Sequence, residues 1–141
     1  MDQAERQRRA EAFITQLPHA RALSLALTDI GPGEVEMRLP HDDRLVGDPE
    51  TGALHGGAVS TLMDTCSGAA VMSHPDAGPM TATLDLRIEY MRPARPGCDI
   101  TARAVCHHVT RSVAFVRVTA GDGTSDVPVA TATGAFTVTA G

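Results

Sequence analysis

The sequence predicts a single α+β domain in which one long helix packs against an antiparallel sheet. Two patterns support this prediction. From Val59 to Ala70, apolar residues recur at three- and four-residue intervals, as they do on one face of a helix. From Thr83 onward, apolar and polar residues alternate in runs that short turns separate. Strands joined by short turns favour antiparallel pairing, and a long helix that packs on such a sheet gives two layers.

The composition is that of an ordinary globular domain and excludes several classes of function. The 141 residues are 43% hydrophobic and 21% charged. No apolar run approaches the ~20 residues of a membrane span, so we expect no membrane partner. The net charge of −5 disfavours nucleic-acid binding. All twelve cations are arginine, which excludes a Schiff-base lysine and a lysine-dependent phosphate loop.

Cysteine usage and the first residues favour a cytoplasmic protein. Three cysteines are an odd number, which favours free thiols in a reducing compartment. The N-terminus is charged and lacks the apolar segment of a secretory signal. No CxxC or HExxH motif is present, and the adjacent His107 and His108 are expected on opposite faces of a strand. We therefore predict neither a metal site nor a cofactor.

The N-terminal segment predicts a helix that precedes the rest of a single domain. Residues 4–17 have an amphipathic pattern, and Pro18 is expected to end it. We treat residues 1–20 as a helical extension of one domain that covers residues 1–141.

Strands and a loop account for most of the remaining chain. Residues 41–52 are polar and rich in turn residues, which indicates a loop over the functional site. The central helix is expected to end near His74. Extended segments are predicted at 23–39 around a Gly-Pro-Gly turn, and at 83–90, 100–106, 112–120 and 130–138. Inward positions on the later strands are mostly Ala, Gly or Val, so the sheet should pack closely on its helix and its remaining surface should meet another subunit.

Two glycines and one acid make the central helix the candidate functional segment. Gly56 and Gly57 open the helix and leave backbone N–H groups uncovered at its positive end, a place for a polarised oxygen. Asp64, two turns later, is the lone carboxylate of the helix and a candidate base or nucleophile. Alternatively, the two glycines only allow the helix to pack closely against the sheet.

Three motifs resemble the PaaI-type hotdog acyl-CoA thioesterases. They are LHGGAVSTLMD, TATLDLRIEYMRPARPG and VATATGAFTV, and the resemblance covers residues 46–138. It implies a hotdog fold, in which a curved antiparallel sheet wraps a long helix. It also implies hydrolysis of an acyl-CoA thioester by a homodimer, which often assembles further into a dimer of dimers. The small residues around Asp64 leave room for an aromatic or an aliphatic acyl group.

The resemblance also implies roles for individual residues. Asp64 falls on the catalytic acid and Gly57 on the amide that polarises the thioester carbonyl, with Gly56 beside it. Thr83 falls where relatives place a hydroxyl that orients water. His55 is expected either to brace the loop or to take part in catalysis.

An asparagine that the resemblance leads us to expect is absent from the loop before the helix. Many relatives have an asparagine six or seven residues before the His-Gly-Gly motif, where this chain has Pro49 and Asp48. Asp48 is the candidate replacement, although a carboxylate cannot donate a hydrogen bond as an amide does.

Arginine is the expected partner of the CoA phosphates, because guanidinium groups bind phosphate in a bidentate fashion. The candidates are Arg92, Arg95 and Arg111.

Two other functions compete with hydrolysis. A non-catalytic acyl-CoA sensor on the same fold would normally carry a DNA-binding extension, and the first 20 residues are too short for one. Hydratases that resemble MaoC proteins use an Asp-x4-His motif, which the chain lacks.

Helix geometry predicts a site shared by two subunits. Gly57 and Asp64 are seven residues apart, which is roughly 10 Å along a helix. An oxyanion donor and a base must each lie ~3 Å from the reacting atoms. Two antiparallel helices about a two-fold axis would bring Gly57 of one chain against Asp64 of the other.

Overall fold

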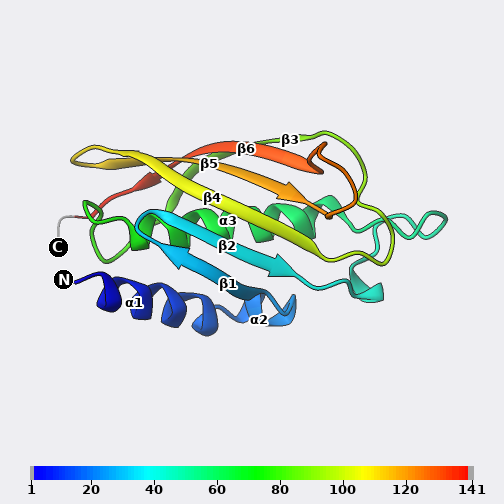
Figure 1. The fold of residues 1–141 in the computed structure, drawn as a ribbon, viewed down its shortest axis with the longest axis horizontal. Coiled ribbons are helices and arrows are strands. Elements are labelled where there is room, and N and C mark those ends of the chain that lie inside the picture. The colour runs from blue at the N-terminus through cyan, green and yellow to red at the C-terminus, as the bar shows by residue number, and fades with distance from the viewer. Residues whose placement is uncertain (1, 140–141) are drawn as a thin grey trace.

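The central helix α3 (Gly56–Ser73) packs against a six-stranded antiparallel sheet, which confirms the predicted α+β architecture (Figure 1). The structure is a computed structural model and describes residues 2–139. The strand order is β1-β2-β4-β5-β6-β3, so β1 and β3 are the two edges of the sheet. The strands are β1 (Ala26–Gly31), β2 (Glu34–Leu39), β3 (Thr83–Tyr90), β4 (Ile100–Val109), β5 (Val113–Gly121) and β6 (Ala130–Thr137).

Two N-terminal helices, α1 (Gln3–Gln16) and α2 (Pro18–Ala22), precede the sheet. Helix α1 packs along α3, and Ala10 and Ile14 are its buried residues. Pro18 ends α1 as expected, but it also begins α2, because proline is tolerated at the first position of a helix. The chain therefore turns a corner at residues 17–20 instead of continuing directly into an extended segment.

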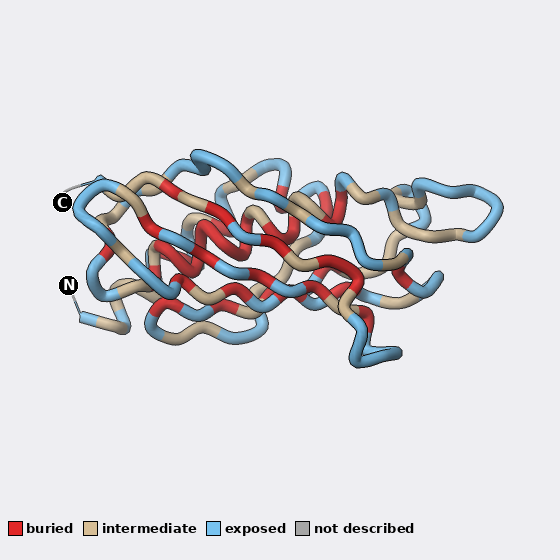
Figure 2. Tube along the Cα trace, turned by 90° about the horizontal axis from the view of Figure 1, so that it is seen from above, coloured by how far each residue is buried: buried red, intermediate tan, exposed pale blue. Residues whose placement is uncertain are grey.

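Small side chains in the second half of α3 let the sheet and α1 approach closely. Twelve of the eighteen residues of α3 are buried, and its coil is mostly red in Figure 2. A Cβ atom on Gly68 would lie 3.7 Å from the ring of Phe13 and 3.8 Å from that of Phe136. Gly68 therefore lies between an aromatic ring of α1 and one of β6.

One face of the first half of α3 remains open. Five residues of this half are not buried, and their spacing places them on one stripe of the helix: Gly56, Gly57, Ser60, Thr61 and Asp64. The predicted functional segment is therefore the part of α3 that the monomer leaves accessible.

Strand β3 is an edge strand with exposed apolar side chains. Leu84 and Tyr90 are 57% and 52% exposed, and both belong to the apolar half of the alternating pattern. An edge strand of this length presents unpaired backbone groups to another chain.

A β-bulge corrects one prediction about β4. His107 and His108 were expected on opposite faces, but the register with β5 shifts between Cys106 and His108. Both histidines are exposed, and the ring of His108 stacks on that of Phe115. Between residues 2 and 139, no helix is both long enough and apolar enough to cross a membrane.

Candidate active site

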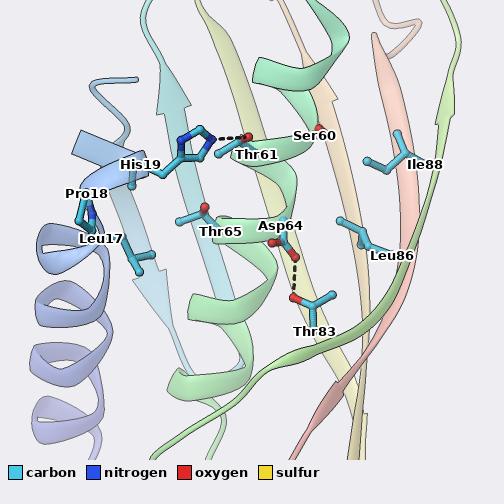
Figure 3. A pocket seen from close by; sticks show the side chains of 11 residues that line it. Leu17, Pro18, His19, Ser60, Thr61, Asp64, Thr65, Thr83, Leu86 and Ile88 are labelled. Carbon is cyan, nitrogen blue, oxygen red and sulfur yellow. Dashed lines mark hydrogen bonds between the residues drawn. The ribbon is translucent and has the colours of Figure 1, made fainter. Parts of the chain in front are cut away.

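Asp64 and Thr83 meet at the open stripe of α3. Thr83, the first residue of β3, donates a hydrogen bond from Oγ1 to Asp64 Oδ1 at 2.8 Å (Figure 3). Both residues line a cavity of about 510 Å³. The hydrogen bond holds Oδ1, and no hydrogen bond to Oδ2 is found among the described residues. The two residues that the sequence singled out for acid and hydroxyl roles are thus brought together.

The Asp64 cavity has a polar floor and apolar walls. Ser60, Thr61 and Thr65 of α3 surround Asp64, while Leu86 and Ile88 of β3 form one wall. The opposite wall is residues 17–20, the corner between α1 and α2. A cavity with apolar walls and a single carboxylate suits an apolar substrate that is attacked at one polar atom.

His55 caps the start of α3. Its backbone is extended, and its ring Nδ1 accepts a hydrogen bond from the N–H of Gly57 at 2.8 Å. The neutral ring must then carry its proton on Nε2. The Gly57 amide, which the resemblance assigned to the substrate carbonyl, is therefore already bound to His55. Among the described residues, none accepts a hydrogen bond from the N–H of Gly56, so this amide is the free donor.

Tyr90, at the end of β3, holds Gly56 in place. The Tyr90 hydroxyl donates to the carbonyl oxygen of Gly56 at 2.8 Å. A Cβ atom on Gly56 would lie 3.3 Å from Cε1 of the Tyr90 ring. Both residues line a second cavity of about 430 Å³, together with Arg92. The sequence analysis did not predict this role for Tyr90. The only sign of it in the sequence is a tyrosine at the end of the alternating segment.

The helix start and Asp64 lie in different cavities of one chain. His55 and Gly57 line a third cavity of about 290 Å³, which does not include Asp64. His19 and Thr61 line both this cavity and the Asp64 cavity. This separation agrees with the roughly 10 Å that seven helical residues span.

Arg92 is held within the protein. Its guanidinium group forms a bidentate ion pair with Asp122, at 2.8 Å from each carboxylate oxygen, and its Nε donates to the carbonyl of Val127. The Asp122 side chain is fully buried. The Arg92 guanidinium holds the pKa of Asp122 well below its usual range, and the pKa of Arg92 is raised in return. These bonds favour a structural role for Arg92 over binding of a phosphate.

The other two arginines lie at opposite ends of β4. Arg95 precedes the strand, on an exposed position of the loop that follows β3, and its backbone N–H donates to Asp122. Arg111 is in the exposed turn after β4, a strand of ten residues and therefore roughly 30 Å long. The structure therefore does not bring the three arginines together in one chain.

Asp48 shapes the loop that leads to His55. It accepts hydrogen bonds from the Thr51 hydroxyl at 2.9 Å and from the backbone N–H of Glu50 at 3.0 Å. These bonds, chiefly the one from Thr51, lower the pKa of Asp48. The carboxylate thus stabilises a turn, and Asp48 is absent from the lining of the Asp64 cavity.

Cys66 is a buried and unreactive cysteine. Cys66 is buried in α3, donates from its thiol to the carbonyl of Val35, and burial raises its pKa to about 12. A thiol with so high a pKa is not a nucleophile near neutral pH. Over residues 2–139, no three His, Cys, Asp or Glu side chains are grouped as a metal ion would require.

Comparison with known proteins identifies the family. Residues 51–129 match the model of the thioesterase superfamily. A Halobacterium salinarum protein that is named as an esterase is 36% identical over 82% of this chain and 81% of its own length. The chain belongs to the thioesterase superfamily. A second relative, the medium/long-chain acyl-CoA thioesterase YigI of Salmonella typhimurium, is 27% identical over 77% of each chain.

The fold of this thioesterase is the hotdog fold that the sequence motifs implied. The PaaI protein of the Escherichia coli phenylacetic acid degradation operon superposes with a TM-score of 0.86, over 99% of this chain and 98% of that chain. The sequence identity of 18% makes this a likeness of fold. The long helix with its antiparallel sheet, predicted from periodicity alone, is therefore confirmed.

Proposed function

We propose that this thioesterase hydrolyses acyl-CoA thioesters to the free acid and CoA. The observation that carries the proposal is the Thr83-oriented carboxylate of Asp64 in an apolar-walled cavity. A helix that begins with a free glycine amide supplies the complementary group. Relatives such as YigI, whose name specifies acyl-CoA, support CoA as the thiol.

The Gly56 amide polarises the thioester carbonyl. It is the free N–H at the positive end of α3, whereas the Gly57 amide is bound to His55. Charge develops on the carbonyl oxygen as the tetrahedral species forms, and a fixed donor stabilises it by about 2.7–4 kcal/mol. His55 supports this arrangement by capping the helix, and Tyr90 fixes the carbonyl of the same residue.

Asp64 supplies the attack on the polarised carbonyl. As a general base it removes a proton from water through Oδ2, and the hydroxide adds to the carbonyl carbon. As a nucleophile it forms an acyl anhydride that water then hydrolyses. In both routes the C–S bond breaks and CoA leaves as the thiolate. Thr83 holds Oδ1 and so aims the other oxygen at the substrate.

The complete site requires two chains. Gly56 and Asp64 are eight residues apart on one helix, roughly 12 Å, and line different cavities. A homodimer formed along the exposed edge strand β3 would place two α3 helices side by side and antiparallel. Gly56 of one chain then faces Asp64 of its partner. The exposed Leu84 and Tyr90 would be covered in this dimer.

Of the three candidate arginines, we propose only Arg95 as a ligand of the CoA phosphates. It is exposed in the loop after β3, and Arg92 of the same loop lines a cavity with Gly56. Arg92 is bound to Asp122, and Arg111 lies beyond the far end of β4. An exposed guanidinium group of this kind contributes mainly to the Michaelis constant, and salt weakens its effect.

A panel of short, medium, long and aryl-CoA thioesters, assayed by release of the free thiol, tests the proposal. We expect hydrolysis of at least one class with a kcat/KM in the ordinary enzymatic range of about 10⁴ M⁻¹s⁻¹ or higher. Tight binding of these thioesters without thiol release would contradict hydrolysis and favour a sensor.

A further inference from the structure

The corner between α1 and α2 is part of the Asp64 cavity, although neither helix was predicted to reach the functional site. Residues 17–20 form the wall that faces β3 across the cavity (Figure 3). The corner is well anchored, because Ala20 is only 2% exposed and its carbonyl accepts the N–H of Leu25. An anchored wall beside a catalytic carboxylate limits what fits in the cavity.

One hydrogen bond joins this wall to the helix. His19 Nε2 and Thr61 Oγ1 are 3.2 Å apart, and Figure 3 shows the His19 ring pointing toward the Thr61 hydroxyl. Thr61 is placed for this contact because its hydroxyl also bonds to the carbonyl of Gly57, one turn earlier, at 2.9 Å. The bond is exposed to solvent, bridges 42 positions of sequence and links α2 to the open stripe of α3.

The two bonded residues are also the boundary between two cavities. His19 and Thr61 line the Asp64 cavity of about 510 Å³ and the smaller cavity of about 290 Å³ on the other side. The smaller cavity has apolar walls from Leu23, Leu45 and Val46. It would continue an apolar path from the Asp64 cavity if the His19–Thr61 pair did not stand between them.

We propose that the His19–Thr61 pair is a gate that sets the length of the acyl group. This inference rests on the proposed acyl-CoA hydrolysis and adds the residues that select among acyl groups. With the hydrogen bond formed, the acyl group ends inside the Asp64 cavity. Without it, a longer aliphatic chain extends past Thr61 into the cavity lined by Leu23 and Leu45. His19 is thus a specificity-determining residue that takes no part in the chemical step.

Chain-length profiles of two variants test the gate. His19→Ala and Thr61→Val each remove the bond, and Thr61→Val keeps the shape of the threonine. Each newly buried methylene should raise kcat/KM about fourfold. Both variants should therefore increase the ratio of kcat/KM for twelve-carbon over four-carbon acyl-CoA by about tenfold or more. The value for the four-carbon substrate should stay within about twofold of the wild type.

Two further variants separate the gate from general damage. Glutamine can place a donor or an acceptor where His19 Nε2 lies, so His19→Gln should keep the wild-type profile. Arg21→Ala changes an exposed residue of the same helix that lines neither cavity, and it should also leave the profile unchanged. Unchanged profiles in both His19→Ala and Thr61→Val would overturn the proposal, as would an equal loss on every chain length.

Binding of S-alkyl-CoA thioethers, which cannot be hydrolysed, decides the inference independently of activity. In calorimetry, His19→Ala and Thr61→Val should bind the twelve-carbon thioether about tenfold more tightly than the wild type does, with unchanged affinity for the four-carbon one. If the wild type hydrolyses none of the thioesters, the proposed function fails, and these affinities still support or reject the gate. Equal affinities of all the proteins for both thioethers would reject it.

Discussion

The hydroxyl of Thr83 donates a 2.8 Å hydrogen bond to the carboxylate of Asp64, which joins the edge strand β3 to the open stripe of α3. Because this bond orients a carboxylate, removing it should cost about 1.5 kcal/mol or more of transition-state stabilisation. Thr83→Val should therefore lower kcat about tenfold with little change in KM. Thr83→Ser keeps the hydroxyl and should stay within about threefold of the wild type in steady-state kinetics. Equal activity in Thr83→Val and the wild type would show that the bond does not orient the catalytic carboxylate.

The role of the free Gly56 amide can be tested by substitution because Gly56 is the first residue of α3. Proline is tolerated at that position, and the extended backbone of His55 suits a residue that precedes proline. Gly56→Pro removes the N–H and should lower kcat about 10²- to 10³-fold. Gly56→Ala is the matched control, since it keeps the N–H and meets the same Tyr90 ring.

In this pair, Gly56→Ala should retain at least about a tenth of the wild-type kcat, and the helix content of both variants should be unchanged by circular dichroism. Loss of activity in Gly56→Ala to the level of Gly56→Pro would assign the glycine to packing against Tyr90 and not to the oxyanion.

A site shared between subunits predicts complementation. Asp64→Asn and Gly56→Pro homodimers should both be inactive. In a mixed dimer, one site carries both lesions and the other carries neither, so up to half of the wild-type activity per mixed dimer should return after subunit exchange. Mass spectrometry under native conditions would establish that mixed dimers form. Mixed dimers that stay inactive would place the whole site within one chain.

The Arg92–Asp122 pair predicts a defined loss of stability. The Asp122 side chain is fully buried but that of Arg92 is 23% exposed, so water can solvate the guanidinium group that Asp122→Ala leaves behind. Hydrogen bonds to a charged group contribute about 1.5–3 kcal/mol, and Asp122→Ala should lower the free energy of unfolding by about that amount. Glu5→Ala breaks the exposed Glu5–Arg9 pair and should cost less than about 1 kcal/mol in the same urea titration. Comparable losses in the two variants would remove the special role of the buried pair.

The same pair predicts the direction of a pH effect. The pKa of Asp122 is lowered in the folded protein, so its stabilising contribution is complete above the unfolded value of about 3.9 and is lost as the pH falls below it. The difference in unfolding free energy between wild type and Asp122→Ala should be constant from about pH 8 to pH 5 and should shrink below pH 4. A difference that grows on acidification would contradict the assignment.

Local patterns in the sequence were enough to predict the elements but not the contacts between distant segments. The periods of α3 and of the later strands followed from residue spacing. The family motifs singled out Asp64 as an acid and Thr83 as a hydroxyl, but the hydrogen bond between them is known only from the structure. The His19–Thr61 and Arg92–Asp122 bonds join residues 42 and 30 positions apart, and no periodicity marks such pairs. The residue type alone could not show that the guanidinium group of Arg92 is already bound to Asp122.

Two local errors also have physical reasons. Pro18 was read only as a helix end, although the first position of a helix accepts proline and α2 begins there. The alternation through His107 and His108 breaks at a bulge, and a bulge adds one residue without a sequence signal of its own. The hydrogen bond from the Gly57 amide to the His55 ring likewise has no signal in the sequence, and it is the reason that we propose Gly56 as the oxyanion donor in place of Gly57.

The central claim is that Asp64 performs the hydrolysis of a CoA thioester. The most direct measurement is thiol release by the wild type, by Asp64→Asn and by Asp126→Asn, an exposed carboxylate changed in the same way, on the best acyl-CoA of the panel. Asp64→Asn should lose at least about 10³-fold in kcat/KM while its affinity for an S-alkyl-CoA stays within about threefold of the wild type. Asp126→Asn should match the wild type. If Asp64→Asn keeps more than a tenth of the wild-type kcat/KM, Asp64 is not the catalytic acid and the account is wrong.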